Sequence, residues 1–270
     1  MDSARRVAIT TLTDGAPGSR ADYVAHEEPL EIQIQGVPCA VVMRTPGHDE
    51  DLVRGFLLSE RIVESINDIM SLRHCSSVSD PEADENVMRA VLSPELPLAI
   101  EKLRRNLYAS SSCGICGKAT IEAALAHGSP VAHTLRIESA ALYLIPERLR
   151  LEQAAFDQTG GLHAAALFDT GAALTGVRED VGRHNAVDKT IGALLGDRAA
   201  GSGKGLAVSG RISLEIVQKA AAVGLEMVVG ISAPTSLAVR FAEALGVTVV
   251  GFVRGKSANV YTHPGRIAEA

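Results

Sequence analysis

Tryptophan is absent from this chain of 270 residues, and aromatic residues make up only 3% of it. So few aromatic side chains argue against a long stacking platform for single-stranded nucleic acid. Basic residues are not in excess either, since the net charge is −6 at pH 7, which argues against DNA as a partner. No apolar run is long enough to cross a bilayer, so no membrane insertion is expected.

Cysteine is also scarce, with Cys39, Cys75, Cys113 and Cys116 the four in the chain. Four cysteines in a chain of this length do not form the disulfide framework of a small secreted protein. The N-terminal residues lack the apolar core of a signal peptide. The expected location is therefore the reducing cytoplasm, where a Cys-x-x-Cys pair serves metal binding or sulfur and redox chemistry more often than a structural disulfide.

Charge is distributed unevenly along the chain. Residues 1–170 carry 15 Lys/Arg and 24 Asp/Glu, a net charge of −9, whereas residues 171–270 carry 11 and 8, a net charge of +3. The C-terminal part is therefore the better host for an anionic ligand, although ordinary surface variation would also produce such a difference.

The first 95 residues predict a smaller, mixed α+β domain. Residues 1–22 are polar and interrupted by glycine and proline, which indicates a loose arm. Period-two alternation predicts strands over residues 30–34, 37–44, 69–74 and 87–92. Acidic residues at positions 49–51 predict the first turn of a helix, with Leu52, Phe56 and Leu57 on its buried side. The proline-flanked segment 93–97 predicts the domain boundary.

Residues 96–270 predict a larger α/β domain. A short helix is expected over residues 117–128, a longer one over residues 145–161, and a strand pair over residues 163–169 and 172–180. From there helices and strands alternate up to residue 253. Alternation of this kind predicts crossover connections and a largely parallel sheet that is covered by helices.

The segment SSCGICG, residues 111–117, is the sharpest chemical signal. The following helix offers free N–H groups and a partial positive charge, which favour thiolate over thiol. Gly114 and Gly117 allow a partner to approach closely. A thiolate here can attack a sulfur donor and hold the terminal sulfur as a persulfide. Cys113 is the expected nucleophile, and Cys116 is expected to carry sulfur or to act as a resolving thiol.

Metal binding is the alternative for this cysteine pair. Zinc-dependent base deaminases use H-x-E followed by P-C-x-x-C. His48 and Glu50 match the first half, and Cys113 and Cys116 match the second, but Ser112 replaces the proline. This hydrolase alternative stays open, as does a thioredoxin-like dithiol.

The segment EDVGRHNAVDK, residues 179–189, combines several functional residue types in one turn. Open α/β sheets bind ligands where strands end and helices begin. Arg183 and Lys189 are candidates for phosphate contacts, and Asp180 and His184 for positioning a ligand or a proton. The alternative is a capped helix with Lys189 on a solvated face.

Two further turns are expected to cluster at one edge of the sheet. The turns 209–211 and 232–236 are rich in small hydroxyl residues and repeat the strand-to-helix geometry. Residues 251–264 follow the last strand and predict an anion-binding loop, with a basic surface loop as the alternative. His163 follows two glycines and is interpreted as a structural histidine.

These segments together resemble one family, the formate dehydrogenase accessory proteins FdhD. The resemblance rests on EEPLEI, TPGHDEDLVRGFLLSE, SSCGICG, TGGLHAAAL, REDVGRHNAVDK, SGR, SAPTSLAV and GFVRGKSANVYTHP, which occur in the family's order between about residues 27 and 266.

This resemblance implies a sulfur carrier, or sulfurtransferase, for the maturation of formate dehydrogenase. Its sulfur would come from a cysteine desulfurase and pass to the molybdenum or tungsten bis(molybdopterin guanine dinucleotide) cofactor, which GDP-like nucleotides would mimic. It also implies a homodimer and a cytidine-deaminase-like, three-layer C-terminal domain without zinc chemistry. The family's persulfide cysteine corresponds to Cys113. Its cofactor-binding stretch corresponds to Phe252, Val253, Arg254, Gly255, Lys256 and Ser257.

Overall fold

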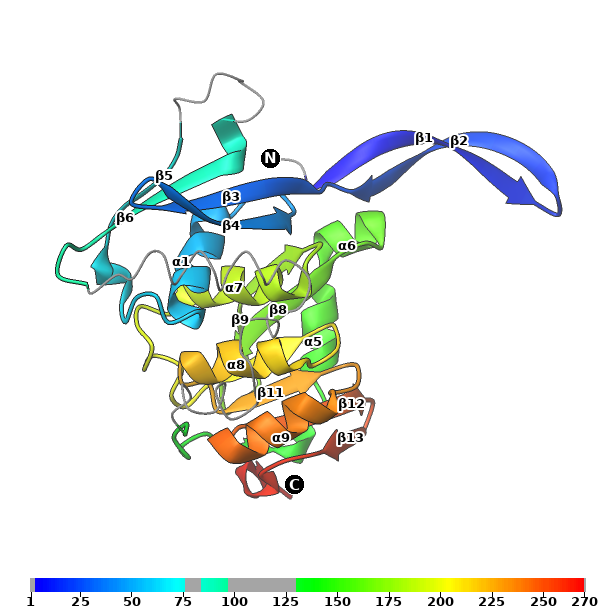
Figure 1. Ribbon diagram of the computed structural model, residues 1–270. Coiled ribbons are helices and arrows are strands. Elements are labelled where there is room, and N and C mark those ends of the chain that lie inside the picture. Colours follow the sequence, from blue (N-terminus) through cyan, green and yellow to red (C-terminus); the bar gives the residue numbers. More distant parts are fainter. Residues whose placement is uncertain (1–2, 76–83, 97–129, 270) are drawn as a thin grey trace.

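The computed structural model describes residues 3–75, 84–96 and 130–269. Two main β-sheets enclose a layer of helices, and a long two-stranded hairpin projects from one side (Figure 1). The division into domains 1–95 and 96–270 stays a prediction. One buried apolar cluster extends from Leu30 in the first sheet, through the helices between the sheets, to Val249 in the second.

The projecting hairpin corrects the expected loose arm. Strands β1 (Ala4–Thr13) and β2 (Ala16–Ala25) pair antiparallel along their whole length. Asp14 and Gly15 connect them with positive φ angles of 51° and 82°. An Asp-Gly pair with both φ angles positive matches the right-handed twist of a hairpin. This local turn signal outweighs the polar composition from which an irregular arm was predicted.

The first main sheet confirms the four strands predicted from alternation. Its order is β4-β3-β6-β5, and its strands are β3 (Glu28–Ile34), β4 (Val37–Arg44), β5 (Ile69–His74) and β6 (Val87–Leu92). Leu30, Ile32 and Ile34 are buried on the face toward the helices.

Helix α1 (Asp49–Ser59) confirms the predicted acidic start and buries Leu52, Phe56 and Leu57. It crosses helix α7 (Arg183–Leu194) at two glycines. A Cβ on Gly55 would lie 1.8 Å from the carbonyl oxygen of Asp188, and one on Gly192 would lie 1.9 Å from that of Asp51. The two helix backbones therefore touch directly at this crossing.

The second main sheet is mixed, which corrects the expectation of a largely parallel sheet. Its order is β13-β12-β11-β10-β8-β9, and only the β10–β11 and β11–β12 pairs are parallel. The strands are β8 (His163–Phe168), β9 (Leu174–Asp180), β10 (Gly205–Val208), β11 (Met227–Gly230), β12 (Thr248–Arg254) and β13 (Ser257–Val260). Short connections join β8 to β9 and β12 to β13, and strands joined so tightly must pair antiparallel.

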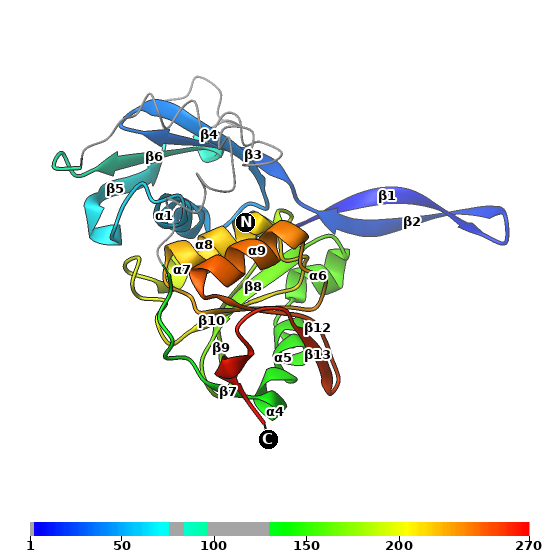
Figure 2. The same cartoon turned by 60° about the horizontal axis from the view of Figure 1, so that its bottom comes forward.

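Helices cover both faces of the second sheet. Helices α7, α8 (Leu214–Ala222) and α9 (Ser236–Leu245) lie side by side on the face toward the first sheet (Figure 2). Helices α4 (Ser139–Leu142) and α5 (Ile145–Leu151) cover the other face. Alternate strand residues follow this division, because Leu206 and Val208 pack toward α7–α9 while Ala207 packs with the α5 side. The part beyond residue 130 therefore has three layers.

The expected long helix over residues 145–161 is divided in two. Helix α5 ends at Leu151 and α6 (Ala154–Thr159) follows it. Gln153 between them has φ −93° and ψ 63°, which is not helical, and its side chain is buried. Gly160 ends α6 in the left-handed conformation, as its glycine predicts.

Short elements complete the described chain. They are the 3₁₀ helices η1 (Ile66–Asp68), η2 (Asp84–Asn86) and η3 (Pro264–Arg266), and the parallel pair β7 (Ile137–Glu138) and β14 (Ile267–Ala268). The helix predicted over residues 117–128 lies outside the described residues. Of the helices in the described ranges, none has the length and apolar character needed to cross a membrane.

Glu226 connects the C-terminal segment to the second sheet. Its fully buried carboxylate accepts hydrogen bonds from Thr134, Leu135 and Gly203 and pairs with the Arg266 guanidinium at 3.2 Å. Burial alone would raise the pKa of Glu226, but the hydrogen bonds, led by that of the Thr134 hydroxyl, lower it from 4.5 to about 2.

This lowered pKa predicts an acid-sensitive contribution to stability. A carboxyl whose pKa falls on folding stabilises the protein above its unfolded pKa and loses that contribution between about pH 4.5 and 2. The loss should be about 3 kcal/mol. Urea unfolding at several pH values should give a shallower acid limb for Glu226→Gln than for the parent protein. Identical acid limbs in the two proteins would refute this role.

Candidate functional site

Most of the predicted site residues lie at one edge of the second sheet. Because β9 runs parallel to β10, β11 and β12, the carboxyl ends of these four strands lie together, with the beginnings of antiparallel β8 and β13. We call this the carboxyl edge; it comprises His163 and residues 180–185, 209–213, 232–236 and 252–257. The predicted meeting of the 209–211 and 232–236 turns is confirmed, since Ile212 N–H donates to Ala233 at 3.1 Å and Thr235 N–H donates to Ile212 at 2.9 Å.

Asp180 is fully buried at the end of β9. Its carboxylate pairs with Lys189 Nζ at 2.7 Å and accepts hydrogen bonds from Gly182 N–H at 2.8 Å and Asn185 Nδ2 at 3.0 Å. A fourth donor is Thr45 N–H at 3.1 Å. With these partners Asp180 supports the turn that begins α7, and its direct contact with a ligand stays a prediction.

Lys189 is not a phosphate ligand on the surface, nor does it lie on a solvated face. It is 1% exposed, and its ammonium group also donates to the carbonyl oxygen of Thr45 at 2.7 Å. The prediction of a surface position was wrong because Lys189 lies two turns inside α7, on the side that packs on α1. The neighbouring Asp188 is buried too and pairs with Lys219 at 2.9 Å.

The loop after β4 is attached to the turn before α7. Besides the two contacts of the Thr45 backbone, the Thr45 hydroxyl accepts from Val181 N–H at 3.1 Å, and Asn185 Nδ2 donates to Met43 O at 2.6 Å. Sequence reasoning assigned no role to Thr45, and no local signal could have found it, because its partners lie more than a hundred residues away.

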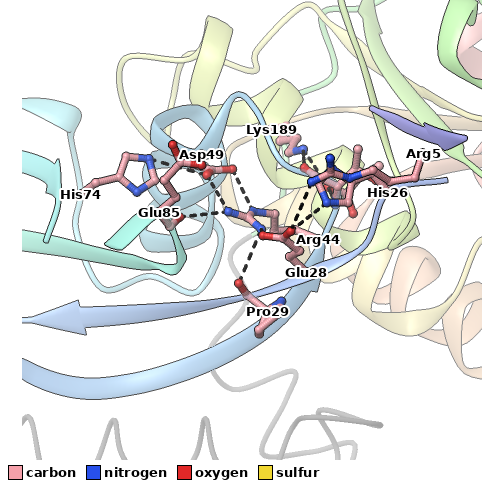
Figure 3. A network of polar contacts seen from close by, with 11 residues as sticks. Arg5, His26, Glu28, Pro29, Arg44, Asp49, His74, Glu85 and Lys189 are labelled. Carbon is pink, nitrogen blue, oxygen red and sulfur yellow. Dashed lines mark hydrogen bonds and ion pairs between the residues drawn. The ribbon is translucent and has the colours of Figure 1, made fainter. Parts of the chain in front are cut away.

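Arg44 fixes the other side of this loop (Figure 3). Its fully buried guanidinium donates to both oxygens of Asp49 at 3.2 and 3.0 Å and to the carbonyl oxygen of Glu85 at 3.1 Å. His74 approaches Asp49 from β5 at 3.6 Å. Asp49, at the acidic start of α1, therefore forms a buried ion pair with Arg44 and also interacts favourably with the helix dipole.

His184 and His163 lie on two sides of the turn before α8. His184 Nε2 lies 2.9 Å from the Glu215 carboxylate and 3.2 Å from Ser213 Oγ. His163 begins β8, where burial and then the positive charges of Arg183, His184 and Arg211 lower its pKa. A neutral His163 can donate one ring N–H and accept at the other nitrogen.

The stretch 252–257 forms the end of β12, a tight turn at Gly255 and Lys256, and the start of β13. Arg254 and Lys256 are exposed, whereas Val253 is buried in the apolar cluster on the α5 side. The predicted anion-binding loop is therefore a hairpin rather than an irregular segment. Its side chains other than Val253 are available to solvent.

Phe252 stands out within this hairpin. It adopts a left-handed φ of 54° at a β-bulge, and 38% of the residue is exposed. A non-glycine residue in the left-handed region is strained, and its conformation costs free energy. Strained residues of this kind are commonly found at ligand sites. Arg254, two residues further along the chain, is also exposed.

The zinc alternative gains no support from the described residues. His48 begins α1 in the left-handed conformation and lies 3.5 Å from Asp51, and Glu50 pairs with Arg54 at 2.7 Å. Burial and then Arg178 lower the pKa of His48. No cluster of three His, Cys, Asp or Glu side chains suited to a metal occurs in the part of the chain that is described. Cys113 and Cys116 lie outside the described residues.

Comparison with known proteins connects this fold and this site to one family. The family model described as FdhD/NarQ matches residues 25–268. The sulfur carrier protein FdhD of Mycolicibacterium paratuberculosis is 44% identical, over 99% of this chain and 100% of its own. That of Streptomyces coelicolor is 43% identical (97% and 95%), and that of Sulfolobus acidocaldarius is 44% identical (97% and 98%).

A solved structure supports the fold. It is the crystal structure of a candidate formate dehydrogenase accessory protein from Desulfotalea psychrophila, similar to this chain with a TM-score of 0.77 over 99% of this chain and 100% of that one. At 22% identity it supports the fold alone. The full-length matches to the curated relatives establish that this chain belongs to the FdhD/NarQ family.

Proposed function

We propose that this chain is a sulfur carrier for the maturation of formate dehydrogenase. The names of the relatives, which match along nearly their whole length, support the sulfur carrier role. The proposed donor is a cysteine desulfurase, and the proposed acceptor is the bis(molybdopterin guanine dinucleotide) cofactor of molybdenum or tungsten. The protein would act as a homodimer in the cytoplasm.

The observation that carries the cofactor part of this proposal is the carboxyl edge. It combines an exposed aromatic ring, Phe252, with the exposed cations Arg254 and Lys256. Guanine can stack on an aromatic ring, and phosphate groups pair with guanidinium and ammonium groups. GDP is therefore the nucleotide expected to occupy this edge in place of the whole cofactor.

The sulfur part rests on the thiol of Cys113. In the proposed first step the Cys113 thiolate attacks the terminal sulfur of the desulfurase persulfide. A bond forms between Cys113 Sγ and that sulfur, the S–S bond of the desulfurase breaks, and its cysteine leaves as a thiolate. The exchange needs no external oxidant. Cys116 would then carry sulfur in turn or resolve the persulfide.

The proposal includes the cytidine-deaminase-like description of the larger domain. The strand order β9-β8-β10-β11-β12, with helices on both faces, supports this description. The zinc hydrolase alternative is not favoured, because the curated relatives are named as sulfur carriers.

The sulfur carrier role is tested by replacing Cys113. After incubation with a cysteine desulfurase and cysteine, the parent protein should gain the mass of one sulfur atom on the peptide that contains Cys113. The Cys113→Ala variant should lack this gain and leave formate dehydrogenase inactive. Cys75→Ala is the matched control, because Cys75 is a buried cysteine next to β5 with no place in the proposed chemistry. Full activation of the dehydrogenase by Cys113→Ala would refute the relay and favour a protein that only holds the cofactor.

A further inference from the structure

A cavity lies between α5 and the edge strand β9, on the face of the second sheet that turns away from α7–α9. Its volume is about 370 Å³. It is lined by Arg148, Glu152, Leu174, Gly176 and Val177. Since β9 ends at the carboxyl edge three residues beyond Val177, the cavity lies between about 10 and 20 Å from that edge. None of its lining residues belongs to the predicted sulfur or nucleotide sites.

A β-bulge in β9 shapes one wall of this cavity. The register of β9 against β8 shifts between Ala165 and Leu167, which gives β9 one extra residue. Gly176 lies in this bulge with a left-handed φ of 61°. As a result Leu174 and Val177, which strict alternation would place on opposite faces, both pack on the α5 side. Bulges of this kind are frequent at sheet edges and beside active sites, where they redirect a side chain.

Two opposite charges line the cavity without pairing. Arg148 lies on α5, and Glu152 directly follows the last residue of that helix. Opposite charges four residues apart on a helix usually attract each other. Arg148 Nη1 instead donates to the carbonyl oxygens of Gly171, at 3.1 Å, and Ala172, in the turn between β8 and β9. Within residues 3–75, 84–96 and 130–269, neither Arg148 nor Glu152 forms an ion pair. A positive and a negative group therefore border the same space.

We propose that this cavity binds a free α-amino acid with a small apolar side chain. The contacts of Arg148 with the turn use only Nη1. Its Nε and Nη2 donors can therefore bind both oxygens of an α-carboxylate. The Glu152 carboxylate accepts hydrogen bonds from the α-ammonium group, and Leu174 and Val177 contact the side chain.

The size of the cavity agrees with this class of ligand. Small-molecule sites range from about 300 to 1,000 Å³, and this cavity lies near the lower limit. It suits an amino acid better than a dinucleotide cofactor. Because the cavity and the carboxyl edge are separate, the amino acid would not compete with a nucleotide at that edge.

Ligand-detected NMR titration of the full-length protein with L-leucine and two analogues tests the site. The analogue 4-methylpentanoate lacks the ammonium group of leucine, and 3-methylbutylamine lacks its carboxylate. The parent protein should bind leucine at least about 10-fold more tightly than either analogue, because each analogue forfeits one charge-assisted contact.

Two variants assign the two charges. Glu152 is exposed, so Glu152→Gln should leave the fold intact. It should weaken leucine binding by about 10-fold and leave 4-methylpentanoate binding unchanged. Arg148→Gln should weaken the binding of both, and Arg148→Lys should restore part of the loss. Because Arg148 also holds the turn between β8 and β9, the Tm of its variants is measured alongside, whereas the Glu152 variant tests the site without touching that turn.

Glu147→Gln is the matched control. Glu147 is an exposed acidic residue in the first turn of α5 and does not line the cavity. Its replacement removes the same charge from the same helix and should leave all three affinities unchanged.

Three results would overturn the amino-acid site. They are no binding of leucine to the parent protein, an equal affinity for leucine in the parent and Glu152→Gln, and binding of 4-methylpentanoate as tight as that of leucine. The last result would assign the cavity to a simple carboxylate or to the C-terminus of a peptide. None of these measurements depends on Cys113 or on the carboxyl edge, so failure of the persulfide experiment leaves them standing.

Discussion

Replacing Gly192 with alanine should destabilise the protein by at least about 3 kcal/mol, although alanine is the better helix former by about 1 kcal/mol. The new methyl group would lie 1.9 Å from the carbonyl oxygen of Asp51 and 2.5 Å from the amide nitrogen of Gly55. Both are backbone atoms of α1, so no side-chain rotation relieves the overlap. The two helices must move apart, which also disturbs the loop at Thr45 that precedes α1.

Thermal unfolding measures this effect. For a chain of this size a loss of 3 kcal/mol corresponds to a decrease in Tm of roughly 6–12 °C. Gly196→Ala is the control, because Gly196 follows α7 and a Cβ there meets nothing within 4 Å. Its Tm should stay within a few degrees of that of the parent protein. Equal Tm values for the Gly192→Ala variant and the parent would contradict the direct contact between the helix backbones.

The second large effect is expected from Lys189→Met. This substitution leaves the Asp180 carboxylate, which is 0% exposed, without its ionic partner. Removing one member of a buried ion pair costs about 3–5 kcal/mol, because the other charge stays buried. The loss should be smaller when Asp180→Asn is combined with it, since the double variant buries no unpaired charge.

A double-mutant cycle in urea unfolding tests this coupling. The double variant should lose less free energy of unfolding than the two single variants together. Lys256→Met, on the exposed turn between β12 and β13, should change the free energy by no more than about 0.5 kcal/mol. Strictly additive losses would mean that Asp180 and Lys189 stabilise the fold independently.

The local sequence pattern was enough to predict most of the strands and helices. Alternation gave β4, β5 and β6 with their observed bounds, because a half-buried strand must place alternate side chains on opposite faces. The acidic residues before Leu52 gave the start of α1. The hairpin β1–β2 was missed although its Asp14-Gly15 turn was present in the sequence, so this error was one of interpretation.

The direction of β8 and the roles of charged residues depend on partners distant in the sequence. Lys189 and Arg183 are equally basic in the sequence, but one is 1% exposed in an ion pair and the other retains a donor without an acceptor in the described chain. Local sequence cannot distinguish the two residues. Their burial and their charged partners depend on the residues of α1 and of the ends of β9 and β10 that surround them.

The sequence by itself determined the family, the cysteine pair as the candidate sulfur carrier, and the succession of strands and helices. These depend on residue types and on spacing along the chain. The tertiary structure alone decided that Asp180 and Lys189 hold the Thr45 loop in place, and that His163 and the base of the Arg183 side chain lie against Gly210. Burial and charge pairing arise only when strands from distant parts of the chain end at the same edge of a sheet.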